Sequence, residues 1–248
     1  MHISLAAETL FHIGSFPVTN SFLTSVIVVA LLLIVGLIVG MNFRRLPAGF
    51  QHVFELAYDS LDELSVSVAG EAGRKITPLA VTFFLYILFS NWLSLLPGVG
   101  SVGLNLVEHG EKVFVPIFRG GNADINTTLA LALVSVIAAQ VYGIRASGLL
   151  GHLKHFKNPL EIISEFSKIL SFGFRLFGNV FAGEVLLLAG ATMLVLITGK
   201  INPLFGLPGG LIMTPFLLLE LFVGFIQAFI FSVLTLVFIG IYVGHKTH

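Results

Sequence analysis

Five long apolar runs, separated by shorter polar segments, set the pattern of this chain. A helix needs about 20 residues to cross a hydrocarbon core of about 30 Å, and each run is long enough to do so. The runs predict five transmembrane helices at about residues 22–41, 77–96, 126–143, 160–199 and 209–244. We therefore expect an all-α membrane protein that forms one membrane domain over residues 1–248.

One further segment, residues 48–70, repeats apolar side chains at helical spacing but is too polar to span the membrane. Pro47 suits the first turn of such a helix. Helices that rest on anionic lipid are usually basic, whereas this polar face carries the acidic residues Glu55, Asp59, Asp62 and Glu63. The pattern predicts an amphipathic membrane-surface helix, and it favours the bundle's own flank or a protein partner over lipid as its neighbour.

The last two runs are too long for a simple crossing. At about 1.5 Å per residue, residues 160–199 and 209–244 make helices of roughly 60 and 54 Å, about twice the hydrocarbon thickness. Either each run folds back as a hairpin, or each crosses at a steep tilt. No cluster of Gly, Pro or Asn that could reverse the chain lies near the middle of either run. Tilt beyond the ordinary 0–40° range is favoured, and such helices need a wide neighbour to lie against.

Composition agrees with a membrane protein and removes several classes of function. Hydrophobic residues make up 56% of the 248 residues and charged residues 10%, and the mean hydropathy is +1.00. The formal net charge of zero gives no electrostatic argument for nucleic acid as a partner. The absence of cysteine excludes disulfides, zinc–thiolate sites and iron–sulfur clusters. The first 20 residues contain Glu8, Pro17 and no basic cluster before an apolar core, which is not typical of a cleaved signal peptide.

Basic residues predict the orientation, because the cytoplasmic loops of membrane proteins carry an excess of Lys and Arg. With an external N-terminus, five spans place eight basic residues on the inside: Arg44, Arg45, Arg74, Lys75, Arg145, Lys154, Lys157 and Lys246. Three lie on the outside, namely Lys112, Arg119 and Lys200. We expect an integral, multi-pass protein with its N-terminus outside and its C-terminus in the cytoplasm.

Arg175 is the most unusual residue of the chain, because it stands inside a long apolar run. An ionisable side chain at that depth costs at least about 2.5–3.5 kcal/mol and by default indicates function. A guanidinium group cannot lose its charge and so cannot avoid this cost by becoming neutral. A purely structural role for Arg175 is therefore hard to support.

The other polar residues of the last two runs can be placed on helix faces at 100° per residue. Glu184 lies nine residues after Arg175, so the two side chains point to opposite sides of their helix and cannot form a simple pair. Glu220 and Gln227 are seven residues apart and share a face of the last helix. Arg175 belongs to one polar stripe that consists of Ser164, Lys168, Ser171, Arg175 and Asn179.

Two polar residues near the ends of spans also have structural interpretations. Lys168 lies near the cytoplasmic end of its helix, where a lysine can extend to the interface without a chemical role. Either Asp124 or Asn126 can cap the third span. Asp124 can instead line a polar path, and the sequence leaves both possibilities open.

Residues deeper in the spans have alternatives as well. Gln227 can serve only as a hydrogen-bond partner across helices, and Glu184 or Glu220 can be a protonated carboxyl that is satisfied within the membrane. However, a fixed cation on one face and carboxyl groups on another are what an ion-transfer protein requires. A buried carboxyl can take up and release protons. A permanent positive charge can hold a passing anion and block direct leakage of cations.

Three other classes of membrane protein fit this pattern less well. A secondary antiporter could also use Arg175, Glu184 and Glu220, but it would normally show an internal repeat, which is not evident here, and would transport ions when purified alone. A haem- or quinone-bearing redox subunit would need buried histidine ligands, and none of the eight histidines is expected at mid-membrane. An intramembrane hydrolase lacks a convincing nucleophile and base at membrane depth. We therefore expect no cofactor and no metal.

Several motifs of the chain are distinctive when taken together. They are Arg175-Leu-Phe-Gly-Asn179 followed by Ala182-Gly-Glu184, the upstream Glu161 and Ser164, the segment Ala123–Leu131, and Gln227-Ala-Phe-Ile-Phe231. In these motifs the chain resembles subunit a of the F-type rotary ATP synthase, from the second span to the C-terminus. The first 70 residues resemble that family only in layout.

The resemblance implies a non-catalytic stator subunit in the cell inner membrane of a bacterium, beside a ring of c subunits and peripheral-stalk b-type subunits. Arg175 would face the ring, attract each ring carboxylate that has lost its proton and prevent proton leakage. Protons would pass through two offset aqueous half-channels, which couples proton flow to rotation and ATP synthesis. The residues implied in proton translocation are Arg175, Glu184, Glu220, Asn179, Gln227 and Asp124.

The resemblance also implies where each of these residues lies along the proton path. Glu184 and Glu220 would line the external half-channel, with Asp124 near its mouth, and Asn179 and Gln227 would lie beside Arg175. The position of Glu220 is histidine in some relatives. Membrane lipid and the transported proton complete the implied partners, and the local carboxylates favour proton over sodium.

Overall fold

The computed structural model describes residues 7–41, 49–96, 99, 102–108, 111–153, 158–198 and 206–244. Several residues named in the sequence predictions lie outside this part of the chain: Arg44, Arg45, Pro47, Lys154, Lys157, Lys200 and Lys246. Within these described ranges, five helices are long and apolar enough to cross a membrane: α1 (Asn20–Met41), α3 (Thr77–Ser94), α4 (Ile125–Ser147), α6 (Pro159–Thr198) and α7 (Gly206–Gly244). The predicted all-α membrane fold with five spans is confirmed.

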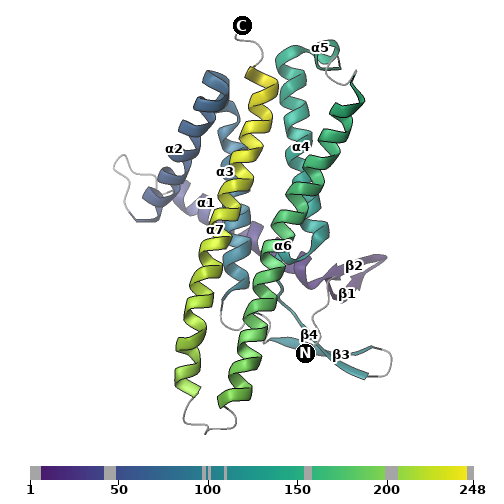
Figure 1. Cartoon of the computed structure of the whole chain (residues 1–248), viewed down its shortest axis with the longest axis vertical. Helices are drawn as coiled ribbons and strands as arrows, with labels where there is room; N and C mark the ends of the chain where they lie inside the picture. The colour runs from purple at the N-terminus through teal and green to yellow at the C-terminus, as the bar shows by residue number, and fades with distance from the viewer. Residues whose placement is uncertain are drawn as a thin grey trace.

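The two longest helices run side by side through the whole bundle (Figure 1). Each is one continuous element, of 40 residues in α6 and 39 residues in α7, so the hairpin alternative is wrong. Their lengths correspond to about 60 Å each. Helix α7 continues through Pro215, which lies within it. Both helices are thus longer than a perpendicular crossing requires, and their tilt in a membrane stays a prediction.

The core lies where α3, α4, α6 and α7 meet. Phe231 of α7 is 2% exposed, and its ring centroid lies 5.3 Å from that of Phe83 on α3 and 5.0 Å from that of Phe172 on α6. Fully buried alanines, Ala132 of α4 and Ala228 of α7, let the backbones approach closely. The most exposed of the five spans is α1, which has only 11% of its most apolar window buried.

The amphipathic helix α2 (Phe50–Ala69) packs on the flank of the bundle, one of the two neighbours that the sequence favoured. Leu61 and Ser65 are buried, and the Ser65 hydroxyl donates a hydrogen bond of 2.6 Å to the Gly73 carbonyl of η1 (Gly70–Lys75). The opposite face remains exposed, including the acidic Asp59 and Glu63. Helix α2 therefore uses one face to close the bundle between α3 and α7.

Within the described residues, two antiparallel hairpins and three short helices, one of which is η1, were not predicted from the sequence. The strands β1 (Thr9–Ile13) and β2 (Phe16–Thr19) pair before α1, and β3 (Gly103–Glu108) and β4 (Glu111–Pro116) pair inside the connection between α3 and α4, which the predicted orientation makes external. The connection continues through η2 (Gly121–Ala123), and α5 (Leu149–Leu153) follows α4. Both hairpins lie on the same side of the bundle, near the lower half of α6 (Figure 1). Strands this short carry a weak periodic pattern.

Candidate ion-conducting site

Arg175 lies on the exposed face of α6. Phe172 and Leu176 are buried in the core, 3% and 0% exposed, and this turns Arg175 outward. Its Nη2 donates a hydrogen bond of 3.3 Å to the hydroxyl of Ser171, one turn earlier. The structure thus places an unneutralised guanidinium on a surface that no element of this chain covers within the described residues.

An open groove runs from Arg175 towards the predicted cytoplasmic end of α6. It has a volume of about 270 Å³, and α7 contributes its apolar wall through Leu234 and Phe238. The polar lining comes from α6, namely Ser164, Ser167, Lys168, Ser171 and Arg175. Much of the stripe predicted from helical spacing therefore lines one groove.

Lys168, which the sequence allowed to extend to the interface without a chemical role, makes specific contacts within the bundle. Its ammonium group pairs with the carboxylate of Glu165, which is 9% exposed, and lies 4.8 Å from the ring centroid of Phe238. Glu165 also accepts hydrogen bonds from the hydroxyl of Tyr242 and, at 2.9 Å, from Nε2 of Gln140. The pair is thus part of a network that joins α4, α6 and α7.

The network continues to α5 through Gln140, whose Oε1 lies 2.7 Å from Nε2 of His152. An amide oxygen can only accept, so Nε2 of His152 carries the proton. His152 is 3% exposed and packs against Gly143, where any Cβ would collide with the imidazole ring. The predicted cytoplasmic end of the bundle is therefore fixed by buried polar contacts that the sequence analysis missed.

Glu184 lies on the other side of α6, as its spacing from Arg175 predicted. Its Oε2 is 3.9 Å from Nε of Arg119, and the two side chains are 27% and 10% exposed. Arg119 comes from the segment between β4 and η2 and had been counted only as an external basic residue. The carboxylate is also hydrogen-bonded to the backbone of Gly120.

Glu220 of α7 packs against α6 next to Glu184. A Cβ at Gly183 would collide with the carboxylate of Glu220, so only glycine lets this carboxyl lie against the α6 backbone. The charges of Glu184 and Glu220 interact with each other, which places the two carboxyl groups in one electrostatic environment. The structure brings together the two acidic residues that the sequence placed on separate helices.

A small cavity of about 10 Å³, close to the space of one water molecule, lies between α3, α6 and α7. Glu220, Asn179 and Gln227 line it, together with Asn91 and Ser94 of α3. Nδ2 of Asn179 donates a hydrogen bond of 2.7 Å to Oε1 of Gln227, which is 3% exposed. Gln227 thus makes the helix-to-helix bond that the structural interpretation proposed, and it makes it with another predicted site residue.

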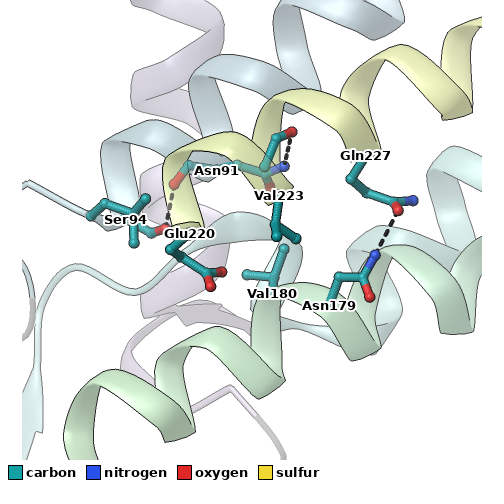
Figure 2. Close-up of a pocket in the computed structure, with 9 residues that line it drawn as sticks. Asn91, Ser94, Asn179, Val180, Glu220, Val223 and Gln227 are labelled. Atoms are coloured by element: carbon teal, nitrogen blue, oxygen red, sulfur yellow. Dashed lines mark hydrogen bonds between the residues drawn. The ribbon is translucent and has the colours of Figure 1, made fainter. Parts of the chain in front are cut away.

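Figure 2 shows how these side chains lie along the cavity. The carboxylate of Glu220 points from α7 towards α6, and Val180 and Val223 lie between it and the Asn179–Gln227 pair. Val180 is 6% exposed. Two apolar side chains therefore separate the carboxylate from the amide pair that lies nearer to the Arg175 region.

Asp124 caps α4, which decides between the two capping candidates. Its Oδ1 accepts a hydrogen bond of 3.0 Å from the backbone N–H of Asn126, and its Oδ2 accepts one of 3.0 Å from the hydroxyl of Ser21 on α1. Asp124 is 6% exposed. The capping role is therefore present in the structure, and the bond to Ser21 adds a contact between α1 and α4.

A buried polar cluster begins at Asn122, two residues before Asp124, and reaches the cavity. Nδ2 of Asn122 donates a hydrogen bond of 2.8 Å to Oδ1 of Asn91, and Nδ2 of Asn91 donates one of 3.1 Å to the Gly224 carbonyl of α7. Oγ of Ser90 and Oδ1 of Asn122 are buried without a hydrogen-bond partner in the described part of the chain. Buried groups of this kind are usually satisfied by ordered water.

The described residues contain no group of three or more His, Cys, Asp or Glu side chains that could hold a metal ion. What they contain is a fixed cation on one side of α6 and two interacting carboxyl groups on the other side, next to buried amides and hydroxyls. In a bundle of five membrane-spanning helices, these features define an ion-conducting membrane protein.

Comparisons with known proteins identify the family. The family model described as ATP synthase A chain matches residues 22–240. Over 243 residues the chain is 32% identical to ATP synthase subunit a of Moorella thermoacetica, which covers 95% of this chain and 96% of that protein. It is 33% identical over 222 residues to ATP synthase subunit a of Syntrophobacter fumaroxidans, with coverage of 86% and 79%. The protein of the same name from Gloeobacter violaceus is 32% identical over 245 residues, with coverage of 96% and 89%.

The chain belongs to the ATP synthase A chain family. It is an integral, multi-pass membrane protein and a subunit of an ATP synthase. The family match begins at residue 22, so the likeness includes α1 and α2 and extends further than the motifs had indicated.

Proposed function

We propose that this chain is the proton-conducting stator subunit of a rotary ATP synthase, with no catalytic site of its own. Protons enter and leave a neighbouring c-subunit ring through two offset half-channels in this chain, and Arg175 separates the two paths. Proton flow is thereby coupled to rotation and to ATP synthesis. Peripheral-stalk b-type subunits hold the chain against the turning ring.

The observation that carries this proposal is the division of α6 into two faces. Arg175 stands on an exposed face beside a groove, whereas Glu184 stands on the opposite face, packed against the Arg119–Gly120 segment. A ring that carries carboxyl groups fits the exposed face, because a permanent cation there attracts each carboxylate once its proton has left. The length of α6 and α7 supports a wide neighbour along which both helices lie tilted.

The external half-channel leads past Asp124 to Glu184 and Glu220. Buried polar groups support this path: Asp124 bonds to Ser21, and Asn122, two residues before Asp124, bonds to Asn91, which lines the cavity at Glu220. Glu184 and Glu220 exchange protons within reach of the ring. The Asn179–Gln227 pair lies beyond Val180 and Val223 as seen from Glu220. Asn179 follows Arg175 by about one turn of α6, so the pair stands between the carboxyl groups and the arginine.

The second half-channel is the groove between Arg175 and the cytoplasmic end of α6. Its serine hydroxyls and the open volume of about 270 Å³ give water a place to follow the helix. The expected orientation, in a bacterial inner membrane with the N-terminus outside, places this groove on the cytoplasmic side. Arg74, Lys75 and Arg145 lie on that side, in agreement with the excess of basic residues in cytoplasmic segments.

The decisive test replaces Arg175 with alanine in the complete ATP synthase and measures ATP-driven acidification of inverted membrane vesicles. We expect coupled pumping to be lost, because the other cation that lines the described groove, Lys168, is paired with Glu165 and is not placed to replace the guanidinium. Arg74→Gln is the matched control: it removes an arginine whose side chain is 64% exposed at the surface and should leave pumping near the wild-type rate. Retained coupled pumping in the Arg175→Ala complex would refute the proposal.

A second test examines the external half-channel. Glu220→Gln keeps the shape of the side chain but removes its proton exchange, so pumping should fall at every pH, and unchanged pumping would exclude the role of Glu220. Ion transport by the purified chain alone, without the rest of the ATP synthase, would instead favour the antiporter alternative.

A further inference from the structure

We propose that Arg119 is a positioning residue for Glu184, and that its guanidinium sets the external pH at which the external half-channel supplies protons. This inference rests on the proposed function and adds to it a residue outside the membrane-spanning helices. Arg119 belongs to the segment between β4 and η2. The external connection would thus take part in proton conduction as well as joining two helices.

The position of the two charged groups is the first argument. Nε of Arg119 lies 3.9 Å from Oε2 of Glu184, and the Arg119 side chain is only 10% exposed. An arginine with so little exposure remains charged, since guanidinium does not deprotonate in proteins. A permanent positive charge is therefore held beside a carboxyl group on the proposed proton path.

The second argument is that the backbone around Arg119 is fixed from three sides. The N–H of Arg119 donates a hydrogen bond of 3.3 Å to Oγ1 of Thr24 on α1. Nδ2 of Asn20, also on α1, donates one of 3.2 Å to the carbonyl of Pro116 at the end of β4. Helix α1 and the β3–β4 hairpin thereby hold the segment that presents the guanidinium to Glu184.

Gly120 holds the Arg119 segment against a third neighbour, the surface formed by α3 and α6. A Cβ at this position would stand 3.0 Å from Cβ of Ser94 on α3 and 3.2 Å from Oε1 of Glu184, which is tighter than ordinary contact. A glycine therefore allows the segment to lie directly against the carboxylate, and its backbone is hydrogen-bonded to Glu184. The approach of Arg119 to Glu184 is thus built by packing and is not a chance contact of two long side chains.

The electrostatic consequence follows from the groups that face Glu184. Within the described residues, two charged groups interact electrostatically with the Glu184 carboxyl: Arg119, in the segment before η2, and Glu220 of α7. Helix α3 contributes only the uncharged Ser94 near this position. Two carboxyl groups in one site hinder each other's ionisation, and a cation beside one of them eases its proton release. The positive charge of Arg119 thus favours release of the proton from Glu184, against the opposing effect of the nearby Glu220.

The experiment uses the complete ATP synthase in liposomes, with the external face of the membrane sector towards the lumen. A potassium gradient with valinomycin fixes the membrane potential, the pH on the ATP side is held constant, and the lumen pH is varied while initial rates of ATP synthesis are recorded. Arg119→Gln should move the half-maximal lumen pH by about one unit to the alkaline side, which is a tenfold change in proton concentration. Arg119→Lys keeps the charge and should stay close to the wild-type midpoint.

Lys112→Gln is the matched control, because it removes a basic residue of β4 from the same external region. It should leave the midpoint in place, because the inference assigns the effect to Arg119 and not to the basic residues of the external connection in general. A midpoint is read from rates normalised to their own maximum, so partial loss of assembly in a variant lowers the amplitude without moving it. Arg119→Met serves as a second neutral variant.

A wild-type midpoint in both neutral variants would overturn the inference, as would an equal shift in Lys112→Gln. Failure of both neutral variants to assemble would also overturn it, because the guanidinium would then be needed for structure. The proposed function fails separately, through retained synthesis by Arg175→Ala in the same liposomes. The two failures are therefore distinguishable.

Discussion

Replacing Gly183 by alanine should impair proton conduction while leaving the bundle folded. The added Cβ would collide with the carboxylate of Glu220, which is the end of a flexible side chain and can move away. Overpacking of this kind costs about 1–3 kcal/mol. The carboxylate must retreat by more than about 1 Å to make ordinary contact with the new Cβ, and a displacement of about 1 Å can already lower the rate at a positioned group by about 100-fold.

The assay is ATP synthesis by the complete complex in liposomes, driven by a fixed pH difference and membrane potential. We expect Gly183→Ala to assemble and to lose about 10- to 100-fold in rate. Gly36→Ala is the matched control, because a Cβ at Gly36 of α1 meets nothing within 4 Å. Its rate should equal that of the wild type.

A second substitution sharpens the test. Shortening the carboxyl side chain with Glu220→Asp should relieve the collision, so the double variant Gly183→Ala with Glu220→Asp should synthesise ATP faster than Gly183→Ala alone. A wild-type rate for Gly183→Ala would refute the reasoning. Equal rates for the single and double variants would show that the loss does not come from this collision.

Three further predictions concern stability, measured as the thermal unfolding midpoint of the purified complex in detergent. Gly143→Ala should lower the midpoint clearly through an overpacking cost of about 1–3 kcal/mol, because its Cβ would collide with the His152 ring; an unchanged midpoint would contradict the packing described. Asp124→Ala should cost about 0.5–2 kcal/mol by removing the cap of α4, whereas Asp124→Asn retains a capping oxygen and should cost less; equal losses would exclude capping as the cause. Glu165→Gln should lower the midpoint because it leaves Lys168 without its anionic partner, and Glu161→Gln on the same helix should have a smaller effect; the reverse order would count against the network.

Local pattern predicted the helices and the faces of α6. Span lengths follow from the number of consecutive apolar residues, and the opposite orientation of Arg175 and Glu184 follows from 100° per residue. Span length and side-chain orientation both depend only on residues within one helix, so they can be predicted from the sequence alone. The continuity of α6 and α7 could be favoured on the same grounds, because no cluster of Gly, Pro or Asn lies near the middle of either helix.

Contacts between distant segments were not predictable in the same way. Arg119 had been counted only as a basic residue outside the membrane, and its place beside Glu184 depends on how β4, η2 and α1 pack. The network around Glu165 joins Gln140, His152 and Tyr242 from three other helices, and helical spacing does not connect them. The two hairpins also escaped prediction, because strands of four to six residues carry little periodic pattern.

The sequence by itself determined that this protein crosses the membrane several times, that a permanent charge stands within it, and which helix face carries that charge. Its motifs also indicated the family. Only the tertiary structure decided which groups meet: Glu184 with Arg119 and Glu220, Asn179 with Gln227, and Asp124 with Ser21. The physical reason is that helix periodicity acts over a few residues, whereas these meetings depend on the packing of helices and loops far apart in the chain.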